Sequence, residues 1–146
     1  MKTSVLIAVN DSFSSRSVID RFIRLPFIKE EVSVTLIHVF RKPSTSEELL
    51  GAEYTLNQQN KFRETLENVK KKLLQSGFPK ENVKTKLIEN PYPTIYDGLL
   101  DQFNREDYNI VVIGRRRMSK AEEFVMGDPS IKLVRTLENA SVLVVK

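Results

Sequence analysis

The chain has 146 residues, of which 40% are hydrophobic and 29% are charged, and it carries a formal net charge of +4. Its length suits one domain that buries about 68–70% of its unfolded surface, and no apolar run approaches the ~18–20 residues of a membrane span. The charge, from 23 basic and 19 acidic residues, is small enough for a solvated surface to explain it. We therefore expect a single domain over residues 1–146, with no affinity for nucleic acid or membranes.

The absence of cysteine and the single histidine exclude several kinds of site. The chain has no cysteine, which excludes disulfides, thiolate metal sites and cysteine nucleophiles. Its one histidine, His38, is too little for a histidine-based metal cluster, so we expect no metal site. The opening residues lead directly into an apolar strand that is too short to form the core of a signal peptide. A cytoplasmic protein is therefore expected.

The first part of the chain predicts two strands around a helix. Ser4–Val9 is short, almost continuously apolar and rich in β-branched residues, as in a central parallel strand covered on both faces. Asn10-Asp11-Ser12 suits a turn that caps the following helix, which ends before Pro26. Val32–Phe40 reads as the second strand. The apolar stripe of the helix consists of Val18, Ile19, Phe22 and Ile23.

The middle of the chain predicts a loop and then a long helix. Residues 41–54 contain Pro, Ser, Thr and Gly and read as a loop with a short turn of helix at Glu47–Leu50. A helix follows from about Thr55 to Ser76, and Gly77 closes it. Its apolar residues recur at intervals of four, three and four: Phe62, Leu66, Val69 and Leu73.

Alternation of strands and helices continues to the end of the chain. Val83–Glu89 alternates apolar and charged residues, which indicates a strand at a sheet edge. The remaining predicted elements are a turn at 90–93, a helix from about Thr94 to Asn104, a strand at Asn109–Ile113, a helix from Asp128 to about Leu137 and a strand at Ser141–Val145. This order favours parallel pairing, because right-handed crossovers need a covering helix. The fold class is therefore α/β, a single doubly wound parallel sheet.

Two glycines mark the most probable ligand site. The fourth strand runs into Gly114-Arg115-Arg116-Arg117, and Gly127-Asp128-Pro129-Ser130 opens the next helix, which gives the spacing Gly-x-x-Arg-x9-Gly-Asp. In an open α/β sheet this arrangement places backbone N–H groups and a positive helix end at the carboxyl edge of the strands, where such folds bind ligands.

With this spacing the chain resembles the universal stress protein family, whose nucleotide-binding members carry Gly-x-x-Gly-x9-Gly-(Ser/Thr) at the same place. The similarity covers nearly the whole chain, including Val5–Asn10, Leu36–Val39 and Ser141–Val145. The resemblance implies a five-stranded parallel sheet of order 3-2-1-4-5 with helices on both faces. It also implies a homodimer formed through the last strand, Ser141–Val145.

The resemblance further implies where a nucleotide would bind. Adenine and ribose would lie near Asn10 and Val39, and the phosphates against the glycine loop and hydroxyls at the helix start. This chain departs from the family pattern at four positions, with Asn10 for Asp, Asp11 for Gly, Arg117 for the second glycine and Asp128 for Ser/Thr. The candidate residues of this altered nucleotide site are Asn10, Val39, Gly114, Arg115, Arg117, Gly127, Asp128 and Ser130.

The departures weaken the case for a nucleotide. Arg117 restricts a backbone that glycine leaves free to approach a phosphate. Asp128 at the helix start supplies an anion from within the chain, worth about 0.5–2 kcal/mol of helix stability, and its charge repels a phosphate. We expect no cofactor, or ATP or AMP at reduced affinity. A side-chain clamp by Arg115, Arg116, Arg117 and Lys120 is the opposing interpretation. We favour solvation of these cations and pairing with Glu122 and Glu123.

Other readings of polar and aromatic residues are weaker. His38 lies inside an apolar strand, where a packed and hydrogen-bonded histidine is more common than a general base. Asn10-Asp11 resembles the acidic pair of phosphorelay receivers, but no phosphoacceptor aspartate ends the third strand. Phe124-Val125-Met126 could pin its loop to the sheet or contact a second copy. Three tyrosines are expected to pack around one helix: Tyr92, Tyr96 and Tyr108.

The sequence thus leaves two main functional hypotheses. The first is a non-enzymatic stress-response or regulatory protein that acts as a homodimer on an unknown protein partner. The alternative is a switch of the same fold in which ATP or AMP changes what the dimer binds. We do not expect an enzyme, because no paired carboxylates or histidine–carboxylate set stand at the expected cleft.

Overall fold

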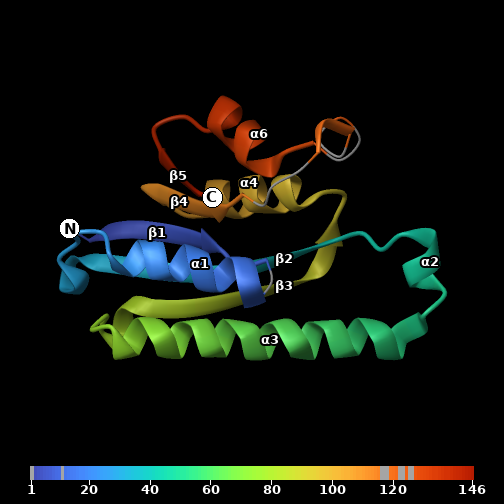
Figure 1. Ribbon diagram of the computed structural model, residues 1–146, viewed down its shortest axis with the longest axis horizontal. Helices are drawn as coiled ribbons and strands as arrows, with labels where there is room; N and C mark the ends of the chain where they lie inside the picture. Colours follow the sequence, from blue (N-terminus) through green and yellow to red (C-terminus); the bar gives the residue numbers. More distant parts are fainter. Residues whose placement is uncertain (1, 11, 116–118, 122–123, 125–126) are drawn as a thin grey trace.

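The computed structural model describes residues 2–10, 12–115, 119–121, 124 and 127–146. It contains one sheet of five parallel strands in the order β3-β2-β1-β4-β5, which confirms the predicted topology (Figure 1). The strands are β1 Thr3–Ala8, β2 Val32–Arg41, β3 Val83–Tyr92, β4 Ile110–Gly114 and β5 Ser141–Val145. The α-helices are α1 Ser12–Ile23, α2 Thr45–Glu48, α3 Gly51–Gln75, α4 Ile95–Arg105 and α6 Pro129–Thr136, and short 3-10 turns cover Lys29–Glu31 and Lys80–Asn82.

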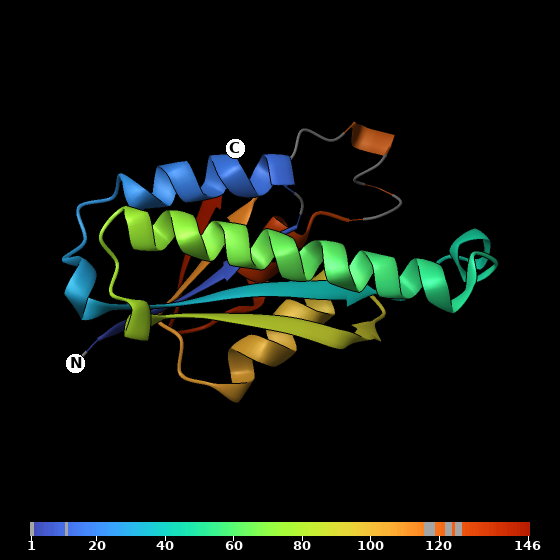
Figure 2. The ribbon, with the colours of Figure 1, turned by 90° about the horizontal axis from the view of Figure 1, so that it is seen from below.

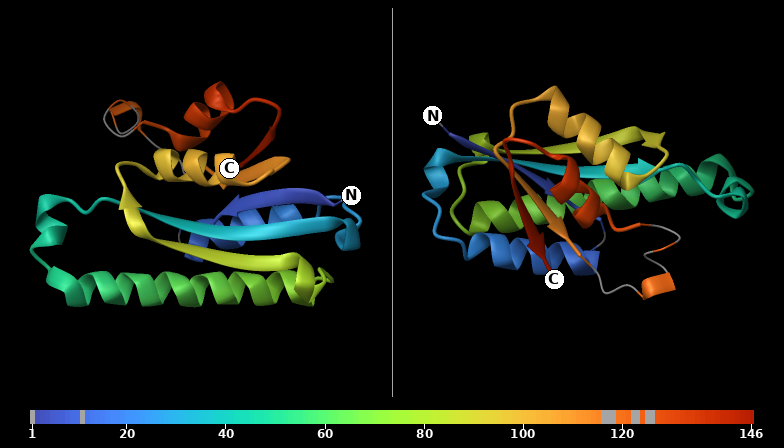
Figure 3. Two further views of the ribbon diagram at one scale, coloured as in Figure 1. Left: turned by 180° about the vertical axis from the view of Figure 1, so that it is seen from behind. Right: turned by 90° about the horizontal axis from the view of Figure 1, so that it is seen from above.

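The helices form one layer on each face of the sheet. α1 and α3 lie side by side on one face, and α4 and α6 lie together on the other (Figures 2 and 3). This arrangement follows from the right-handed crossovers. The chain crosses the sheet first from β1 to β3 and then back toward β5, and crossovers in opposite directions place their helices on opposite faces. The sheet is therefore covered on both faces, as the apolar strand sequences predicted.

The central strand β1 contributes to both cores. Val5 and Ile7 face α1 and α3, whereas Leu6 faces α4, and all three side chains are fully buried. Successive side chains of a strand point to opposite faces, so a strand covered on both sides must be apolar at every position. Burial of each such side chain contributes about 1.5–3 kcal/mol.

The two edges of the sheet differ in character. β3 carries Lys84 and Lys86, whose ammonium groups lie 3.4 and 2.7 Å from the carboxylate oxygens of Glu106. This charged edge is the one that its alternating sequence predicted. β5 is apolar, and within the described residues β4 is its sole neighbouring strand.

Two predictions about the middle of the chain were wrong. A turn was expected at residues 90–93, but β3 continues to Tyr92, whose carbonyl accepts a hydrogen bond of 2.7 Å from the Lys42 amide. Pro91 is tolerated there because an edge strand need not donate to a ladder on both sides. A shift in register between Val39 and Arg41 lets Tyr92 pair with Arg41 despite the irregular sequence.

The loop predicted at residues 41–54 is largely helical. Ser44 caps α2 by accepting a hydrogen bond from the Glu47 amide, so this helix begins earlier than the predicted turn. Gly51, with φ +80°, then joins α2 to α3, so α3 begins four residues before the expected Thr55. A glycine adopts this left-handed conformation without steric cost, and it serves here as a corner between helices.

The joined helices project past the sheet. α3 is longer than the strands it covers, and its first turns extend with α2 beyond the end of β2 (Figure 2). Leu49, Leu50 and Leu56 are exposed in this projecting part, Leu49 by 84%. No helix among the described residues is both long and apolar enough to cross a bilayer.

The Glu106 cluster on the β3 edge makes stability depend on pH. Hydrogen bonds from Lys86 and Tyr108 lower the pKa of Glu106 to about 2. Because this value lies below that of the unfolded chain, the stabilisation is present above about pH 4.5 and is lost as the pH falls toward 2. Glu106→Gln should therefore lower the free energy of unfolding by about 0.2–1 kcal/mol at pH 7, and this loss should shrink as the pH falls toward 2.

Urea denaturation at both pH values measures this difference. Glu64→Gln, on the exposed face of α3, is the matched control and should show no pH-dependent difference from the wild type. An equal effect of Glu106→Gln at pH 7 and pH 2 would contradict the electrostatic origin.

Candidate functional site

The candidate site lies at the carboxyl ends of β1 and β4. These strands are neighbours in the sheet, and the chain leaves β1 toward β2 on one side while β4 lies on the other. Such a point, where the strand order reverses, is where open α/β sheets bind ligands. Asn10 follows β1, and Gly114 is the last residue of β4. The residues that the sequence predicted on these two strands therefore lie at the edge where open α/β sheets bind ligands.

Asp128 is the N-cap of α6. Its Oδ1 accepts hydrogen bonds from the Ser130 amide at 3.0 Å and from the Ser130 hydroxyl at 2.6 Å. Its Oδ2 accepts a hydrogen bond from the Arg115 Nε at 2.6 Å. The residue is only 7% exposed. One nearly buried carboxylate therefore accepts hydrogen bonds from both donors of Ser130 in the first turn of the helix.

This environment keeps the carboxylate ionised. Burial opposes the charged form of Asp128, but the hydrogen bonds from Ser130 and Arg115 outweigh it and hold the pKa of the Asp128 carboxyl below its usual value. A carboxylate beside unpaired amides at the N-terminus of a helix is stabilised by those dipoles. The N-terminus of α6 therefore already carries a negative charge at the position where a helix without this side chain would attract a phosphate.

Arg115 connects three elements at this edge. It follows β4, its amide donates to the Val145 carbonyl of β5 at 2.7 Å, and its guanidinium reaches the cap of α6. The sequence interpretation paired the arginines of this loop with Glu122 and Glu123, whereas Arg115 pairs with Asp128. Arg116, Arg117, Glu122 and Glu123 lie outside the described residues. The opposite charges at the two ends of the glycine segment were the signal that could have revealed this pair.

The two glycines of the motif have structural reasons to be glycine. A Cβ on Gly114 would come within 2.8 Å of the Val18 Cγ2 on α1. Gly127 has φ +71°, and a Cβ there would meet the Lys132 Cε at 2.9 Å. Helix packing and a left-handed backbone therefore account for both residues without a bound phosphate.

Asn10 follows the end of the central strand β1, and Val39 lies in the neighbouring strand β2. Asn10 is half-buried after β1. Val39 is 3% exposed, belongs to the core under α4, and lies so close to that helix that a Cβ on Gly98 would be 2.2 Å from its Cγ1. The structure thus brings Gly114, Arg115, Asp128 and Ser130 to one edge of the sheet, whereas Val39 is occupied with core packing through its side chain.

His38 has the packing environment that the sequence suggested. Its Nδ1 lies 2.6 Å from the Val9 carbonyl oxygen and must donate, because a carbonyl only accepts. The ring stacks on Phe62 with centroids 3.6 Å apart. Burial lowers the pKa of His38, against the opposing effect of the hydrogen bond to Val9, and so favours the neutral ring. Across the described ranges, no group of three His, Asp or Glu side chains is placed to hold a metal ion.

Removing the cap carboxylate should destabilise the protein. Asp128→Ala leaves the Ser130 amide and the partly buried Arg115 without this partner, so we expect a loss of about 1–2 kcal/mol in the free energy of unfolding. Asp128→Ser keeps a capping oxygen and should lose less. Urea denaturation measures both, and an Asp128→Ala variant as stable as the wild type would contradict the role of the cap.

Comparisons with known proteins agree with this architecture. The model of the Universal stress protein family matches residues 1–146. The solved structure of hypothetical protein MJ0577 is 22% identical, with a TM-score of 0.76, and covers 100% of this chain and 96% of its own. A universal stress protein in complex with cAMP is 14% identical, with a TM-score of 0.68 and coverage of 99% and 97%.

A third solved structure comes from Archaeoglobus fulgidus. This universal stress protein in complex with dAMP is 16% identical, with a TM-score of 0.60 and coverage of 100% and 98%. A search of curated proteins found no match. Because the family model spans the entire chain, the protein belongs to the universal stress protein family.

Proposed function

We propose that this protein is a non-enzymatic regulatory member of its family, acts as a homodimer in the cytoplasm, and has lost tight nucleotide binding. The observation that carries the proposal is the Asp128 carboxylate at the N-terminus of α6. It takes both donors of Ser130 and the Nε of Arg115. These are groups that a phosphate at this helix start would need.

A triphosphate would have to displace this carboxylate. The negative charge of the triphosphate is repelled by Asp128, and Pro129 has no backbone N–H to donate at the first helical position. Separation of Arg115 from Asp128 would leave a nearly buried carboxylate without its cation, which costs more than the pair itself contributes. The arrangement therefore favours the empty, internally neutralised state over the nucleotide-bound state.

A nucleotide-dependent switch is the second candidate. Two solved relatives are complexes with cAMP and dAMP, and each of these ligands has a single phosphate group. Such a ligand brings less charge to the edge than a triphosphate. Arg115 could exchange its carboxylate partner for the phosphate without losing a charge-assisted hydrogen bond. This reading gives ATP or AMP binding at reduced affinity.

The proposal assigns no catalytic residue. The one histidine of the sequence is only 5% exposed in β2, and its ring stacks on Phe62, so little of it is open to a substrate. The Asp128 carboxylate is engaged by three donors. Neither group is therefore placed to take a proton from a bound substrate.

The homodimer would form through β5. This strand carries Val142, Leu143 and Val144, which are only half-buried. An apolar edge with unpaired backbone groups invites pairing, whereas the charged β3 edge discourages it. Antiparallel pairing of two β5 strands about a two-fold axis would satisfy both copies at once.

Calorimetric titration with ATP and Mg²⁺, and separately with AMP, tests the nucleotide part of the proposal. The wild type should bind with a Kd weaker than about 1 mM. Asp128→Ser removes the resident charge and restores a family-like hydroxyl, so it should bind at least about tenfold more tightly. Asp107→Ser, which makes the same change on an exposed turn, should behave as the wild type. A wild-type Kd near about 1 μM would overturn the proposal.

Sedimentation analysis tests the dimer. The wild type should have twice the monomer mass, and Leu143→Lys should have the monomer mass because two lysines would meet in the paired strands. Leu143→Ala keeps the strand neutral and should remain dimeric. Far-UV circular dichroism checks that Leu143→Lys is folded. A monomeric wild type, or a folded Leu143→Lys variant of unchanged mass, would contradict pairing through β5.

A further inference from the structure

The N-terminal half of α3 is held to the sheet mainly by an aromatic contact with β2. The His38 ring stacks on Phe62 of α3 with centroids 3.6 Å apart, and it meets the edge of the Phe40 ring at 4.6 Å. Residues 51–61 of α3 include no buried side chain. The C-terminal half of the same helix, in contrast, buries Leu66, Val69 and Leu73. His38 therefore lies where the well-packed part of α3 ends.

The segment before this contact is weakly attached. α2 and the first turns of α3 project beyond the end of β2, and α2 has no buried residue (Figure 2). A segment with few buried apolar contacts opens locally at a free-energy cost well below that of global unfolding. The contact between His38 and Phe62 therefore decides whether this segment stays against the sheet.

The neutral form of the His38 ring suits this position better than the charged form. Its Nδ1 donates to the Val9 carbonyl oxygen at 2.6 Å, so a further proton would be taken at Nε2. The residue is 5% exposed, and burial lowers the pKa of the His38 ring against the opposing effect of the hydrogen bond to Val9. The face of Phe62 attracts a cation, but the loss of hydration is the larger effect. A proton therefore binds more tightly once the ring has left its place.

The charged side chains of the adjoining elements do not compensate for a charge on His38. On α3, Lys61 Nζ lies 5.9 Å from the centroid of the Phe62 ring, and Arg63 pairs with Glu89 of β3 at 3.0 Å. On β2 itself, Arg41 pairs with Glu47. β1 carries no charged residue. None of the ion pairs among the described residues includes His38.

We propose that mildly acidic solution releases α2 and residues 51–61 of α3 from the sheet by protonation of His38. A histidine in an unfolded segment has a pKa of about 6.5. The packed neutral ring therefore contributes its full stabilisation above this pH and loses it as the pH falls further. The C-terminal half of α3 stays in place, because the side chains that it buries do not titrate. Release exposes the rings of Phe40 and Phe62 to solvent.

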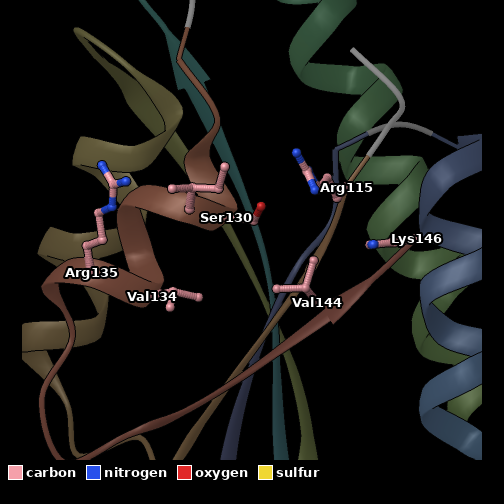
Figure 4. Close-up of a pocket in the computed structure, with 7 residues that line it drawn as sticks. Arg115, Ser130, Val134, Arg135, Val144 and Lys146 are labelled. Atoms are coloured by element: carbon pink, nitrogen blue, oxygen red, sulfur yellow. The ribbon is translucent and has the colours of Figure 1, made fainter. Parts of the chain in front are cut away.

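This contact is separate from the cap of α6. A hollow of about 310 Å³ beside that cap is lined by residues that include Arg115, Ser130 and Val144 (Figure 4). Its described lining residues come from the end of β4, from α6 and from β5 with the residue that follows it, and His38 instead faces α3. Protonation of His38 should therefore leave the hydrogen bonds of Asp128 unchanged.

Nuclear magnetic resonance measures the titration directly, because the chain has one histidine and its ring signals need no further assignment. The imidazole signals should give a pKa below the value of about 6.5 for an unfolded histidine. A pKa at or above that value would overturn the proposal, since the packed site would then favour the charged ring.

Hydrogen exchange followed by mass spectrometry tests the release. Each rate is divided by that of an unstructured peptide of the same sequence, because intrinsic exchange also depends on pH. From about pH 7.5 to about pH 5, protection of residues 55–62 should fall by at least about threefold and at most about 30-fold, the limit for one proton and a pKa of about 6.5. Protection of residues 66–75 should change by less than about twofold.

Two variants remove the proton-binding group. His38→Phe keeps an aromatic ring against Phe62, and His38→Gln provides a second neutral side chain, so protection of residues 55–62 should be independent of pH in both. Glu89→Gln is the matched control, since it removes a carboxylate that contacts α3 and keeps His38, and it should retain the wild-type pH dependence. Equal protection of the wild type at both pH values would overturn the proposal. A pH-dependent loss that persists in both His38 variants would do the same.

Discussion

The connection from β4 through α6 to β5 depends on the contacts of one carboxylate. Asp128 accepts from the Ser130 amide and hydroxyl and from Arg115, while the Arg115 amide bonds to Val145. These contacts join the ends of β4 and β5 to the first turn of α6. A nearly buried charge is stable only when such partners surround it, so these contacts hold the three elements together at the carboxyl edge of the sheet.

The two glycines of the motif have structural roles that need no ligand. Gly114 allows α1 to approach β4, and Gly127 adopts a left-handed conformation before the helix. Both needs persist without a nucleotide, because they come from packing and backbone geometry. Asp128 differs, since its carboxylate is held by Ser130 and Arg115. The two glycines follow from the packing and backbone geometry of this edge and do not by themselves indicate phosphate binding.

The two edges of the sheet carry different kinds of side chain. β3 carries the charged residues Lys84 and Lys86, and both form ion pairs with the carboxylate of Glu106. β5 has an apolar strand, and beside it lie the exposed Ile131 and Val134 of α6. Charge suits an edge that faces water, and apolar residues suit an edge that is covered by another chain or a ligand. The two edges therefore expose different kinds of surface.

The sequence pattern by itself determined the number of strands and their alternation with helices, whereas the order 3-2-1-4-5 was what the family resemblance implied. Continuous apolar runs such as Val5–Val9 and alternating runs such as Val83–Leu87 report burial on two faces or one, which is a local property of the pattern. Asp128 was also readable as a helix cap, because capping involves residues only two positions apart.

Only the tertiary structure decided the partner of Asp128, the extension of β3 through Pro91 to Tyr92, and the early start of α3 at Gly51. The same holds for the pocket between α6 and β5. The partner of Asp128, the pocket and the extension of β3 depend on contacts between residues far apart in the chain, and spacing along the sequence does not encode which distant groups meet in space. The start of α3 depends on the left-handed conformation of Gly51, which the sequence allows but does not require.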